Sequence, residues 1–443
     1  MQRWALIWWL CAMGCGVVLA ENGVLRSEAT VFVDQLSEGN YGMVFARFDE
    51  AMGRALPKET LRMTWEALER QVGVYERQTG VRSERAGKYE AVFVTCRFER
   101  MTLDVKVVFD PEGRVAGLFF LPAGMSTPSR SAPYVVSDAF KEREVKIGKA
   151  PWVLPGTLSV PEGSGPFPAV VLVHGTGPSD RDATVGACTP FRDLAQGLAS
   201  RGIMVLRYEK RTRHYAKQME SLSDRLTTEE ETVADALAAV AFVKTVPNVD
   251  ARAVYVAGHS FGGTLAPEIG RQDPEIAGLI VLAGITRRLE DVIVEQYAYI
   301  FGLDGEVSDA ERAYLAELEA QRTRVRGEEL TKSPPSSELP LGLPAAYWLH
   351  LRGYRPELTA ARLNMPMLIL QGGRDYQATR QDFEGWREAL GRLERVRFKW
   401  FPELNHLFVA GEGESGPADY LTSGHVSLRV IEEIRGWIAG RSP

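Results

Sequence analysis

The sequence predicts an α/β protein in which a mostly parallel sheet is flanked by helices and follows a small α+β domain. From about residue 135 onward, short apolar runs alternate with helical patterns, as in proteins built from repeated strand–helix units. Before that point, a helical spacing of apolar residues gives way to strict alternation, which is typical of antiparallel strands. One connection in the large domain greatly exceeds the length of about 15 residues that ordinary loops rarely pass, so it predicts an insertion.

The small α+β domain is expected over residues 21–122. Phe32, Phe45 and Phe48 recur at helical spacings in its first half. Alternating apolar residues then predict three antiparallel strands, at 92–98, 103–109 and 115–121. Residues 123–134, which are rich in serine, proline and glycine, are expected to form a linker. We find no catalytic constellation in this domain and interpret it as a packing or docking module.

The large domain is expected over residues 135–443. Its strands are predicted at 169–173, 203–208, 254–257, 279–282, 367–370 and 396–400. Pro190 stands at a favourable first position of a helix, and Thr228 with Glu231 has the spacing of a capping box at the start of another.

The long insertion, at about residues 285–364, is expected to form a mainly helical cap. Ser308 and Glu311 have the spacing of a capping box, and a short helix is predicted at 345–351 after Pro344. Because the insertion follows a strand of the sheet, we expect it to cross the carboxyl edge of that sheet.

The first 20 residues are interpreted as a signal peptide. Arg3 precedes an apolar stretch over residues 4–19, and Ala20 supplies a small residue before cleavage ahead of Glu21. We therefore expect a secreted or periplasmic protein with no stable membrane insertion after cleavage. The alternatives are an uncleaved membrane anchor and a lipoprotein signal at Cys15.

Composition narrows the range of partners. The formal net charge of −6 and the pI near 5.7 argue against a nucleic-acid partner, because such a surface repels phosphates. Only Cys96 and Cys188 lie beyond the signal, and a disulfide between them is neither excluded nor indicated. No Cys/His cluster has the spacing of zinc ligands, so we expect no metal.

Gly258-His259-Ser260-Phe261-Gly262 directly follows the apolar run 254–257. A nucleophile elbow needs this order of strand, serine and helix, and its glycines leave space for a strained turn. We therefore predict that Ser260 is a catalytic nucleophile, which requires a general base.

His406 is the predicted base, because it alone among the six histidines lies in a loop just after the final strand. Asp375 is the predicted acid, since it directly follows strand 367–370. The order serine, acid, histidine along the chain is the one that the nucleophile-elbow enzymes have.

The oxyanion hole is predicted from two backbone N–H groups, those of Phe261 and Thr176. Thr176 lies in His174-Gly175-Thr176-Gly177, the loop after strand 169–173, where glycines permit a bend. His174 itself is expected to be structural, because no triad role is left for it.

Five segments together resemble a bacterial α/β-hydrolase family of carboxylesterases, related to serine aminopeptidases and dienelactone hydrolases. The segments are residues 174–182, 207–211, 258–262, 371–377 and 404–408. The resemblance covers about residues 140–440 and implies the α/β-hydrolase fold with ester hydrolysis and no cofactor. Glu209 and Thr212 depart from the family's usual Asp and Gly without touching the triad. The small domain resembles a cystatin-like or nuclear-transport-factor-like domain of unknown function found ahead of such secreted hydrolases.

Two further groups of residues lie outside the predicted triad and oxyanion hole. Asp180, Arg181, Asp182, Arg207 and Arg211 are expected to form a charge network of structural importance near the site entrance. Tyr347 and Tyr354, on one face of a predicted cap helix, are expected either to line an acyl pocket or to pack the cap on the core.

The leading functional hypothesis is a serine hydrolase that cleaves small-molecule, short-chain carboxylic esters through an acyl-enzyme. A peptidase or amidase with the same triad is the first alternative, with Glu290, Asp291 and Glu295 available to bind a substrate amino group. A non-catalytic binding protein is the second, and the complete triad argues against it.

Overall fold

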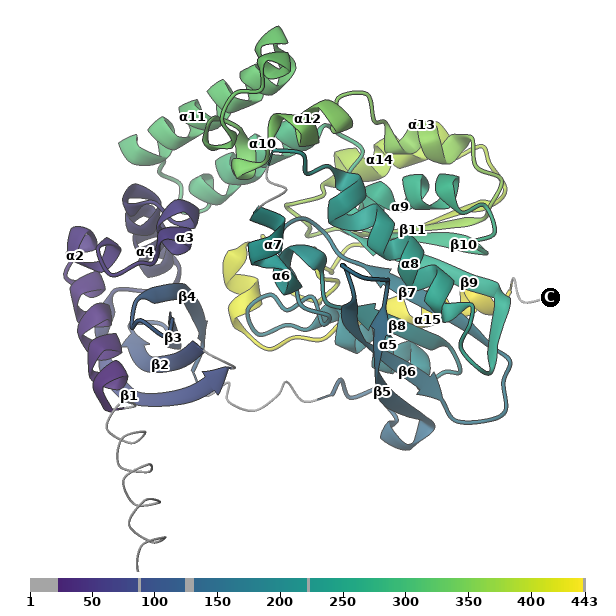
Figure 1. Ribbon diagram of the computed structural model, residues 1–443, viewed down its shortest axis with the longest axis horizontal. Helices are drawn as coiled ribbons and strands as arrows, with labels where there is room; N and C mark the ends of the chain where they lie inside the picture. The colour runs from purple at the N-terminus through teal and green to yellow at the C-terminus, as the bar shows by residue number, and fades with distance from the viewer. Residues whose placement is uncertain (1–22, 87–88, 124–130, 221–223, 441–443) are drawn as a thin grey trace, which may run out of the picture. The chain divides into compact units, whose positions relative to one another are not determined.

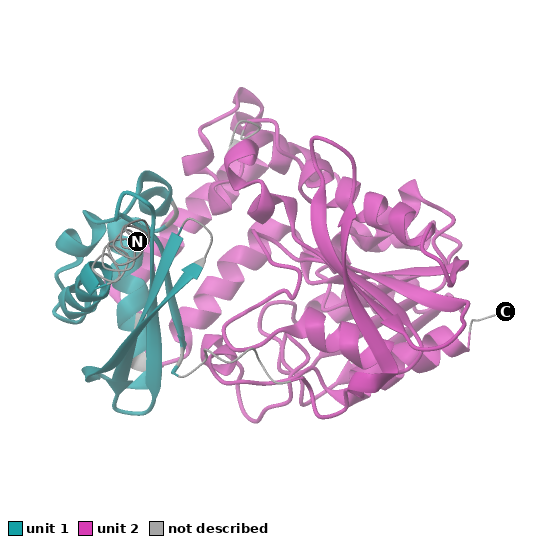
Figure 2. Ribbon diagram, turned by 60° about the horizontal axis from the view of Figure 1, so that its bottom comes forward, with its two compact units in different colours: residues 1–128 teal, residues 129–443 magenta. Residues whose placement is uncertain are grey.

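The computed structural model describes residues 23–440 except 87–88, 124–130 and 221–223. Two compact units divide the chain, residues 1–128 and 129–443 (Figure 2). The predicted signal peptide lies outside the described residues, as does most of the predicted linker. Cys96, in the first unit, and Cys188, in the second, are buried free thiols.

The first unit begins with helices and ends with an antiparallel sheet. After a helix over residues 23–37, the helices are α2 (Tyr41–Phe45), α3 (Glu50–Ala55) and α4 (Lys58–Val72). The strands are β1 (Tyr75–Ala86), β2 (Tyr89–Phe98), β3 (Thr102–Phe109) and β4 (Val115–Pro122), hydrogen-bonded in that order. Trp65 of α4 packs its ring against Phe98 of β2, with ring centroids 5.8 Å apart, so the helices cover one face of the sheet.

Strand β1 was not predicted, and its sequence explains why. Its residues, YERQTGVRSERA, are mostly polar and remain largely accessible at the edge of the sheet. An edge strand that buries few side chains lacks the alternation from which strands are predicted.

The second unit is built on an eight-stranded sheet with the order β12-β11-β10-β9-β7-β8-β6-β5 (Figure 1). The six predicted strands are all present, as β7 (Phe167–Val173), β8 (Met204–Tyr208), β9 (Val249–His259), β10 (Gly278–Leu282), β11 (Met367–Gly372) and β12 (Val396–Phe401). Within this set of six, each pair of hydrogen-bonded neighbours runs parallel. The sheet therefore confirms the predicted α/β class.

Two antiparallel strands, β5 (Phe140–Ile147) and β6 (Leu154–Pro161), extend the sheet beyond β8 and were not predicted. The middle of β5, KEREVK, is mainly exposed, so this outer strand also lacks an apolar pattern.

Helices α5 (Pro190–Ala199), α8 (Ala234–Val243), α9 (Phe261–Gln272), α14 (Arg380–Leu390) and α15 (Leu428–Ala439) flank the sheet. Strands β8, β10 and β11 are buried along their whole length, because helices cover both faces. Pro190 opens α5, as expected.

The expected capping box at Thr228 is wrong. Residues Glu229–Val233 form a turn of π-helix (η2), and the Thr228 side chain makes no capping hydrogen bond. Thr227 instead pairs with Glu230, whose carboxylate accepts from the Thr227 N–H at 2.9 Å. Glu231 itself is buried.

The insertion after β10 consists mainly of helices, as predicted. They are α10 (Leu289–Gly302), α11 (Asp309–Arg326), α12 (Ala345–Leu351) and α13 (Pro356–Ala361), with short 3-10 turns between α11 and α12. Ser308 and Glu311 form the predicted capping box at the start of α11. Helix α10, the next element after strand β10, is the first element of this cap.

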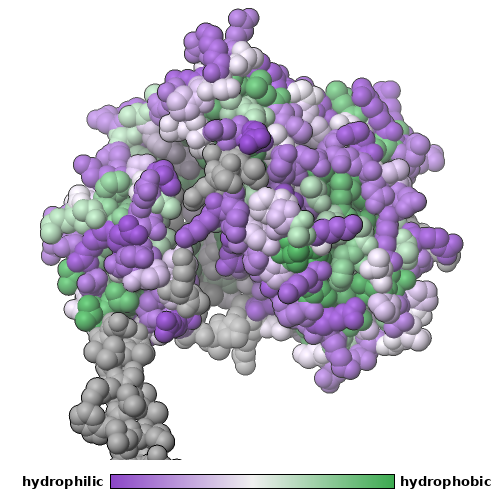
Figure 3. All heavy atoms as spheres, in the orientation of Figure 1, coloured by the Kyte–Doolittle hydropathy of each residue, from purple (hydrophilic) through white to green (hydrophobic). Residues whose placement is uncertain are grey.

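No helix among the described residues is both long and apolar enough to cross a membrane. On the face seen in Figure 3, apolar residues lie in small groups among hydrophilic ones. Scattered exposure of this kind is ordinary for a folded protein.

Candidate active site

Ser260 lies at a sharp turn between strand β9 and helix α9, as the motif predicts. Its backbone has φ 56° and ψ −124°, a conformation that a residue with a side chain rarely adopts. The Ser260 N–H donates to the Leu282 carbonyl at 2.8 Å, which ties the turn to strand β10. A hydrogen bond to the neighbouring strand thus stabilises the strained turn.

The glycines on either side of Ser260 are required by space. A Cβ atom on Gly258 would lie 2.1 Å from the Gly262 carbonyl oxygen, and one on Gly262 would lie 2.4 Å from the carbonyl oxygens of Val173 and His174. Side chains at these two positions would push apart the backbone segments that meet at the elbow. The motif therefore reflects close packing between the elbow and strand β7.

His406 and Asp375 come together although they are 31 positions apart in the sequence. The His406 Nδ1 and the Asp375 Oδ2 are 2.8 Å apart, and both side chains are buried. A carboxylate at Nδ1 sets the tautomer of the ring and leaves Nε2 as the basic atom. The pair has the geometry of a general base with its orienting acid.

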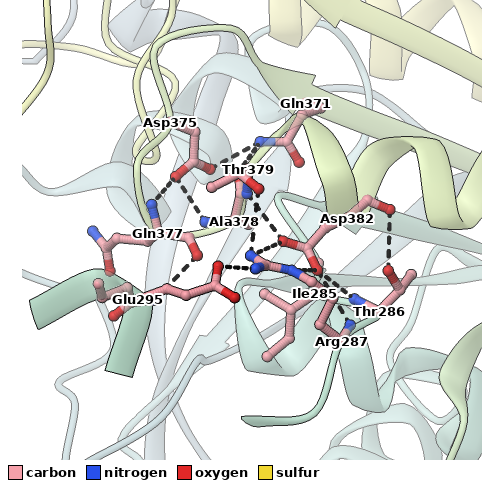
Figure 4. A network of polar contacts seen from close by, with 12 residues as sticks. Ile285, Thr286, Arg287, Glu295, Gln371, Asp375, Gln377, Ala378, Thr379 and Asp382 are labelled. Atoms are coloured by element: carbon pink, nitrogen blue, oxygen red, sulfur yellow. Dashed lines mark hydrogen bonds and ion pairs between the residues drawn. The ribbon is translucent and has the colours of Figure 1, made fainter. Parts of the chain in front are cut away.

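Asp375 is itself fixed by three hydrogen bonds (Figure 4). Its Oδ1 accepts from the N–H groups of Gln377 at 2.8 Å and Ala378 at 2.9 Å. The amide of Gln371 donates to Oδ2 at 2.9 Å. These donors hold the carboxylate in place and determine its direction.

A second buried acid, Asp382, lies beside this group in Figure 4 and serves a different purpose. Its carboxylate accepts from the Thr286 N–H at 3.0 Å and from the Arg287 guanidinium at 2.9 Å. It therefore fixes the start of the cap to helix α14.

His259 connects the elbow to the loop that carries His406. Its Nε2 donates to the His406 carbonyl at 2.8 Å, and the two rings have centroids 4.7 Å apart. Burial lowers the pKa of His259 to about 3, so this ring is neutral. Among the described residues there is no hydrogen bond between the Ser260 hydroxyl and His406. In enzymes without a ligand this bond is often long or poorly aligned, and it shortens only when substrate binds.

His174 has the structural role expected of it. Its Nε2 donates to the Asp180 carbonyl at 2.9 Å and so closes the loop after β7. Burial, aided by the charge of Lys210, lowers the pKa of His174 to about 3.

The loop after β7 lies directly against the candidate nucleophile. A Cβ atom on Gly175 would be 3.0 Å from the Ser260 Cβ and 3.4 Å from its Oγ. Thr176 and Phe261, the two predicted oxyanion donors, line the same cavity as Ser260. The predicted donors and nucleophile are therefore brought together.

That cavity has a volume of about 250 Å³ and is lined mainly by apolar side chains from the cap. The lining residues are Thr176, Ser260, Phe261, Ile285, Leu289, Val292, Ile293, Gln296, Tyr297, Ile300, Leu341, Tyr376 and Gln377. Most of the apolar ones lie on one face of helix α10. Their helical spacing was visible in the sequence and could have identified them as a pocket.

The expected pocket role of Tyr347 and Tyr354 is corrected by the structure. Tyr347 is fully buried and donates to Glu231 Oε2 at 2.6 Å. Tyr354 donates to the Thr264 carbonyl at 2.7 Å, and neither residue lines the cavity that contains Ser260. Both pack the cap on the core, which was the other interpretation of their spacing.

The acidic residues of α10 do not reach this cavity either. Asp291 is paired with Arg326, and Glu295 with Arg287. Glu290 is buried and lines a separate, smaller cavity. These carboxylates are therefore not positioned to bind an amino group beside Ser260.

The predicted charge network exists, but it divides into several ion pairs. Arg207 binds Asp182 at 2.7 Å, and Arg181 binds Glu209 at 2.9 Å. Arg211 pairs with Asp235 on α8, and Asp180 accepts from Thr184. The network's role is structural, since it joins loops to strands and helices of the same unit.

A sequence profile of the α/β-hydrolase family matches residues 170–415, more than half of the chain. The chain belongs to the α/β-hydrolase family. A profile of proteins of unknown function (DUF3887) matches residues 29–118, in agreement with the resemblance noted for the small domain. Esterase EstD from Thermotoga maritima is 38% identical over 416 residues, which cover 94% of this chain and 96% of that protein.

Solved structures show weaker likenesses. Acylaminoacyl peptidase from Pyrococcus horikoshii has a TM-score of 0.47 at 15% identity over 82% of this chain, which spans 56% of the peptidase. A putative dienelactone hydrolase from Klebsiella pneumoniae has a TM-score of 0.41 at 19% identity, over 68% of this chain and 99% of that one.

Among the residues that the structure describes, no group of three or more His, Cys, Asp or Glu side chains could hold a metal ion.

Proposed function

We propose that this α/β-hydrolase is a serine esterase that cleaves short-chain carboxylic esters through an acyl-enzyme. The observation that carries the proposal is that the strained Ser260 elbow shares a cavity with Thr176 of the loop against it, and that His259 of the elbow is hydrogen-bonded to His406, whose ring pairs with Asp375. The identity of 38% with an esterase over nearly the whole chain supports the same reaction.

In the proposed mechanism, Ser260 Oγ attacks the acyl carbon and His406 Nε2 takes its proton. The backbone N–H groups of Phe261 and Thr176 stabilise the negative oxygen of the tetrahedral intermediate. His406 then protonates the leaving alcohol, and Asp375 stabilises the charged ring at each step. Water, activated by His406, releases the acid from Ser260 in the second half of the reaction.

The cavity supports a small apolar acyl group. Its volume of about 250 Å³ lies below the roughly 300–1,000 Å³ that are common for sites of drug-sized ligands. Leu289, Ile293 and Ile300 offer apolar surface, whereas the acids of α10 are engaged in ion pairs or lie elsewhere. An ester is therefore favoured over a peptide with a free amino terminus.

A fluorophosphonate probe and paired substrates test the proposal. The full-length protein is expected to be labelled at Ser260 and to hydrolyse nitrophenyl acetate or butyrate. Its kcat/KM for aminoacyl anilides is expected to be at least a hundredfold lower. Labelling at another residue, or faster cleavage of the anilide, would reject the assignment.

Export from the cytoplasm is part of the proposal and rests on the sequence of residues 1–20. N-terminal sequencing of the protein from its native cells is expected to begin near Glu21. A cytoplasmic protein that retains Met1 would contradict it.

A further inference from the structure

Lys210 is a buried charged residue outside the proposed triad, and it reaches the loop beside the nucleophile. Its ammonium donates to the Gly175 carbonyl at 2.6 Å and to Glu231 Oε1 at 2.6 Å. Lys210 and Glu231 are only 2% and 4% exposed. A buried ion pair of this kind contributes little to stability compared with apolar residues of similar size, so its presence invites a functional explanation.

The Gly175 carbonyl belongs to the same peptide group as the Thr176 N–H. A trans peptide is planar, and its C=O and N–H point in opposite directions. The bond from Lys210 therefore fixes the direction of the Thr176 N–H as well. Because Gly175 lies against Ser260, that direction determines whether the N–H can serve the oxyanion.

Lys210 is held in turn by residues from two other parts of the fold. Glu231 lies in the π-helical turn Glu229–Val233, a feature that is frequent at functional sites. The hydroxyl of Tyr347, on cap helix α12, donates to Glu231 Oε2 at 2.6 Å. A continuous chain of hydrogen bonds thus joins the cap, the turn and the Gly175 carbonyl.

We propose that Lys210 is a positioning residue that aims the Thr176 N–H into the oxyanion hole, and that Glu231 and Tyr347 hold it there. This inference rests on the proposed esterase function. It assigns a role to Lys210 alone within the segment 207–211, none of which belongs to the triad. It also gives Tyr347 a part in the reaction that is distinct from lining the pocket.

The first variant is Lys210→Met in the full-length protein, with kcat and KM measured on a short nitrophenyl ester. Loss of one oxyanion donor costs about 10²–10³ in kcat, so a misdirected donor is expected to lower kcat by about 10- to 100-fold. KM is expected to change less than threefold, because the ester's ground state makes little use of the hole.

An inhibitor pair separates this role from a general structural one. A trifluoromethyl ketone forms a tetrahedral adduct with the serine and places an oxyanion in the hole, whereas the matching methyl ketone binds largely intact. Lys210→Met is expected to weaken the fluoroketone by the factor lost in kcat and the methyl ketone by less than threefold.

Arg211→Met is the matched control. It removes the neighbouring buried ion pair with Asp235, which does not contact the Gly175 loop. Its kcat is expected to stay within threefold of wild type.

Tyr347→Phe is the milder second variant, because it removes only one hydroxyl. It is expected to lower kcat about three- to tenfold at unchanged KM. The inference therefore stays testable if Lys210→Met does not fold.

If the wild type is active and Lys210→Met leaves kcat and fluoroketone affinity unchanged, the inference is overturned while the proposed function stands. If Lys210→Met does not fold, an unchanged kcat in Tyr347→Phe also overturns the inference. A wild type that neither hydrolyses esters nor reacts with a fluorophosphonate would overturn the proposed function and this inference with it. Equal losses in Arg211→Met and Lys210→Met would also overturn it, since they would indicate a general effect on the fold.

Discussion

The Nε2–H of His259 donates to the backbone carbonyl of His406 at 2.8 Å. This bond joins the residue before the proposed nucleophile to the proposed base, across 147 positions of sequence. It requires a proton on Nε2 of the His259 ring. Because burial lowers the pKa of His259 to about 3, the ring is neutral at neutral pH, and its Nε2–H tautomer makes the link between the two loops of the site.

The stability of the protein is expected to fall in acid because of His259 and His174. Burial lowers the pKa of each to about 3, below the value of about 6.5 of an unfolded chain. Between these values the unfolded chain binds protons that the folded protein does not. The free energy of unfolding should therefore decrease by about 1.4 kcal/mol per pH unit for each histidine as the pH falls from 6.5 toward 3.

Denaturant unfolding at pH 6.5 and 4.5 measures this dependence. His259→Gln keeps a hydrogen-bond donor without the titration, so its pH dependence should be weaker than that of wild type by the contribution of one histidine. His214→Gln, at an exposed position, is the control and should match wild type. Equal pH dependence in all three proteins would contradict the prediction.

Ser260→Ala is expected to abolish ester hydrolysis and leave the fold intact. Removal of a serine nucleophile in a triad lowers kcat by roughly 10⁶-fold. Activity on a nitrophenyl ester and the circular dichroism spectrum check the two parts. Retention of more than about a thousandth of the wild-type activity would reject Ser260 as nucleophile.

Asp375→Asn is expected to lower kcat by about 10⁴-fold, because an amide at this position favours the wrong tautomer of His406. Asp382→Asn is the matched control, since this buried acid binds Arg287 and has no contact with His406. It should lose stability but keep kcat within a few fold. Similar losses of kcat in both variants would remove the distinction between the two acids.

Short acyl esters are expected to be preferred, with the limit set by helix α10. Each buried methylene contributes about 0.8 kcal/mol, or roughly fourfold in kcat/KM, until the cavity is full. Ile293→Ala should move the optimum to a longer chain, because it shortens a side chain that lines the cavity. Tyr354→Phe, which lies outside this cavity, should not move it.

A series of nitrophenyl esters from acetate to palmitate measures the optimum. A wild-type maximum at palmitate would rule out the closed pocket. The same optimum in Ile293→Ala and wild type would remove α10 from the determination of chain length.

Activity is expected to survive exhaustive dialysis against a chelator, since the proposed reaction uses only the triad and backbone donors. The measurement is kcat/KM before and after treatment. A chelator-inactivated enzyme that recovers with added zinc or manganese would disprove a metal-independent mechanism.

The amino-acid sequence by itself predicted the six parallel strands, the Ser260 elbow and the order of serine, acid and histidine. These features are local: apolar runs mark buried strands, and glycines mark the sharp turns that follow them. The edge strands β1 and β5 escaped prediction because they bury few side chains, so their sequences lack a pattern.

Only the tertiary structure decided which residues surround the proposed chemistry. Helical spacing identified Tyr347 as a residue on one face of a helix, but it could not say which face met the cavity. The long-range packing of the cap places α10 beside Ser260 and brings the Tyr347 hydroxyl into a hydrogen bond with Glu231. In the same way, Lys210 has no sequence signal for its bond to Gly175, because that bond depends on two loops that only the folded sheet brings together.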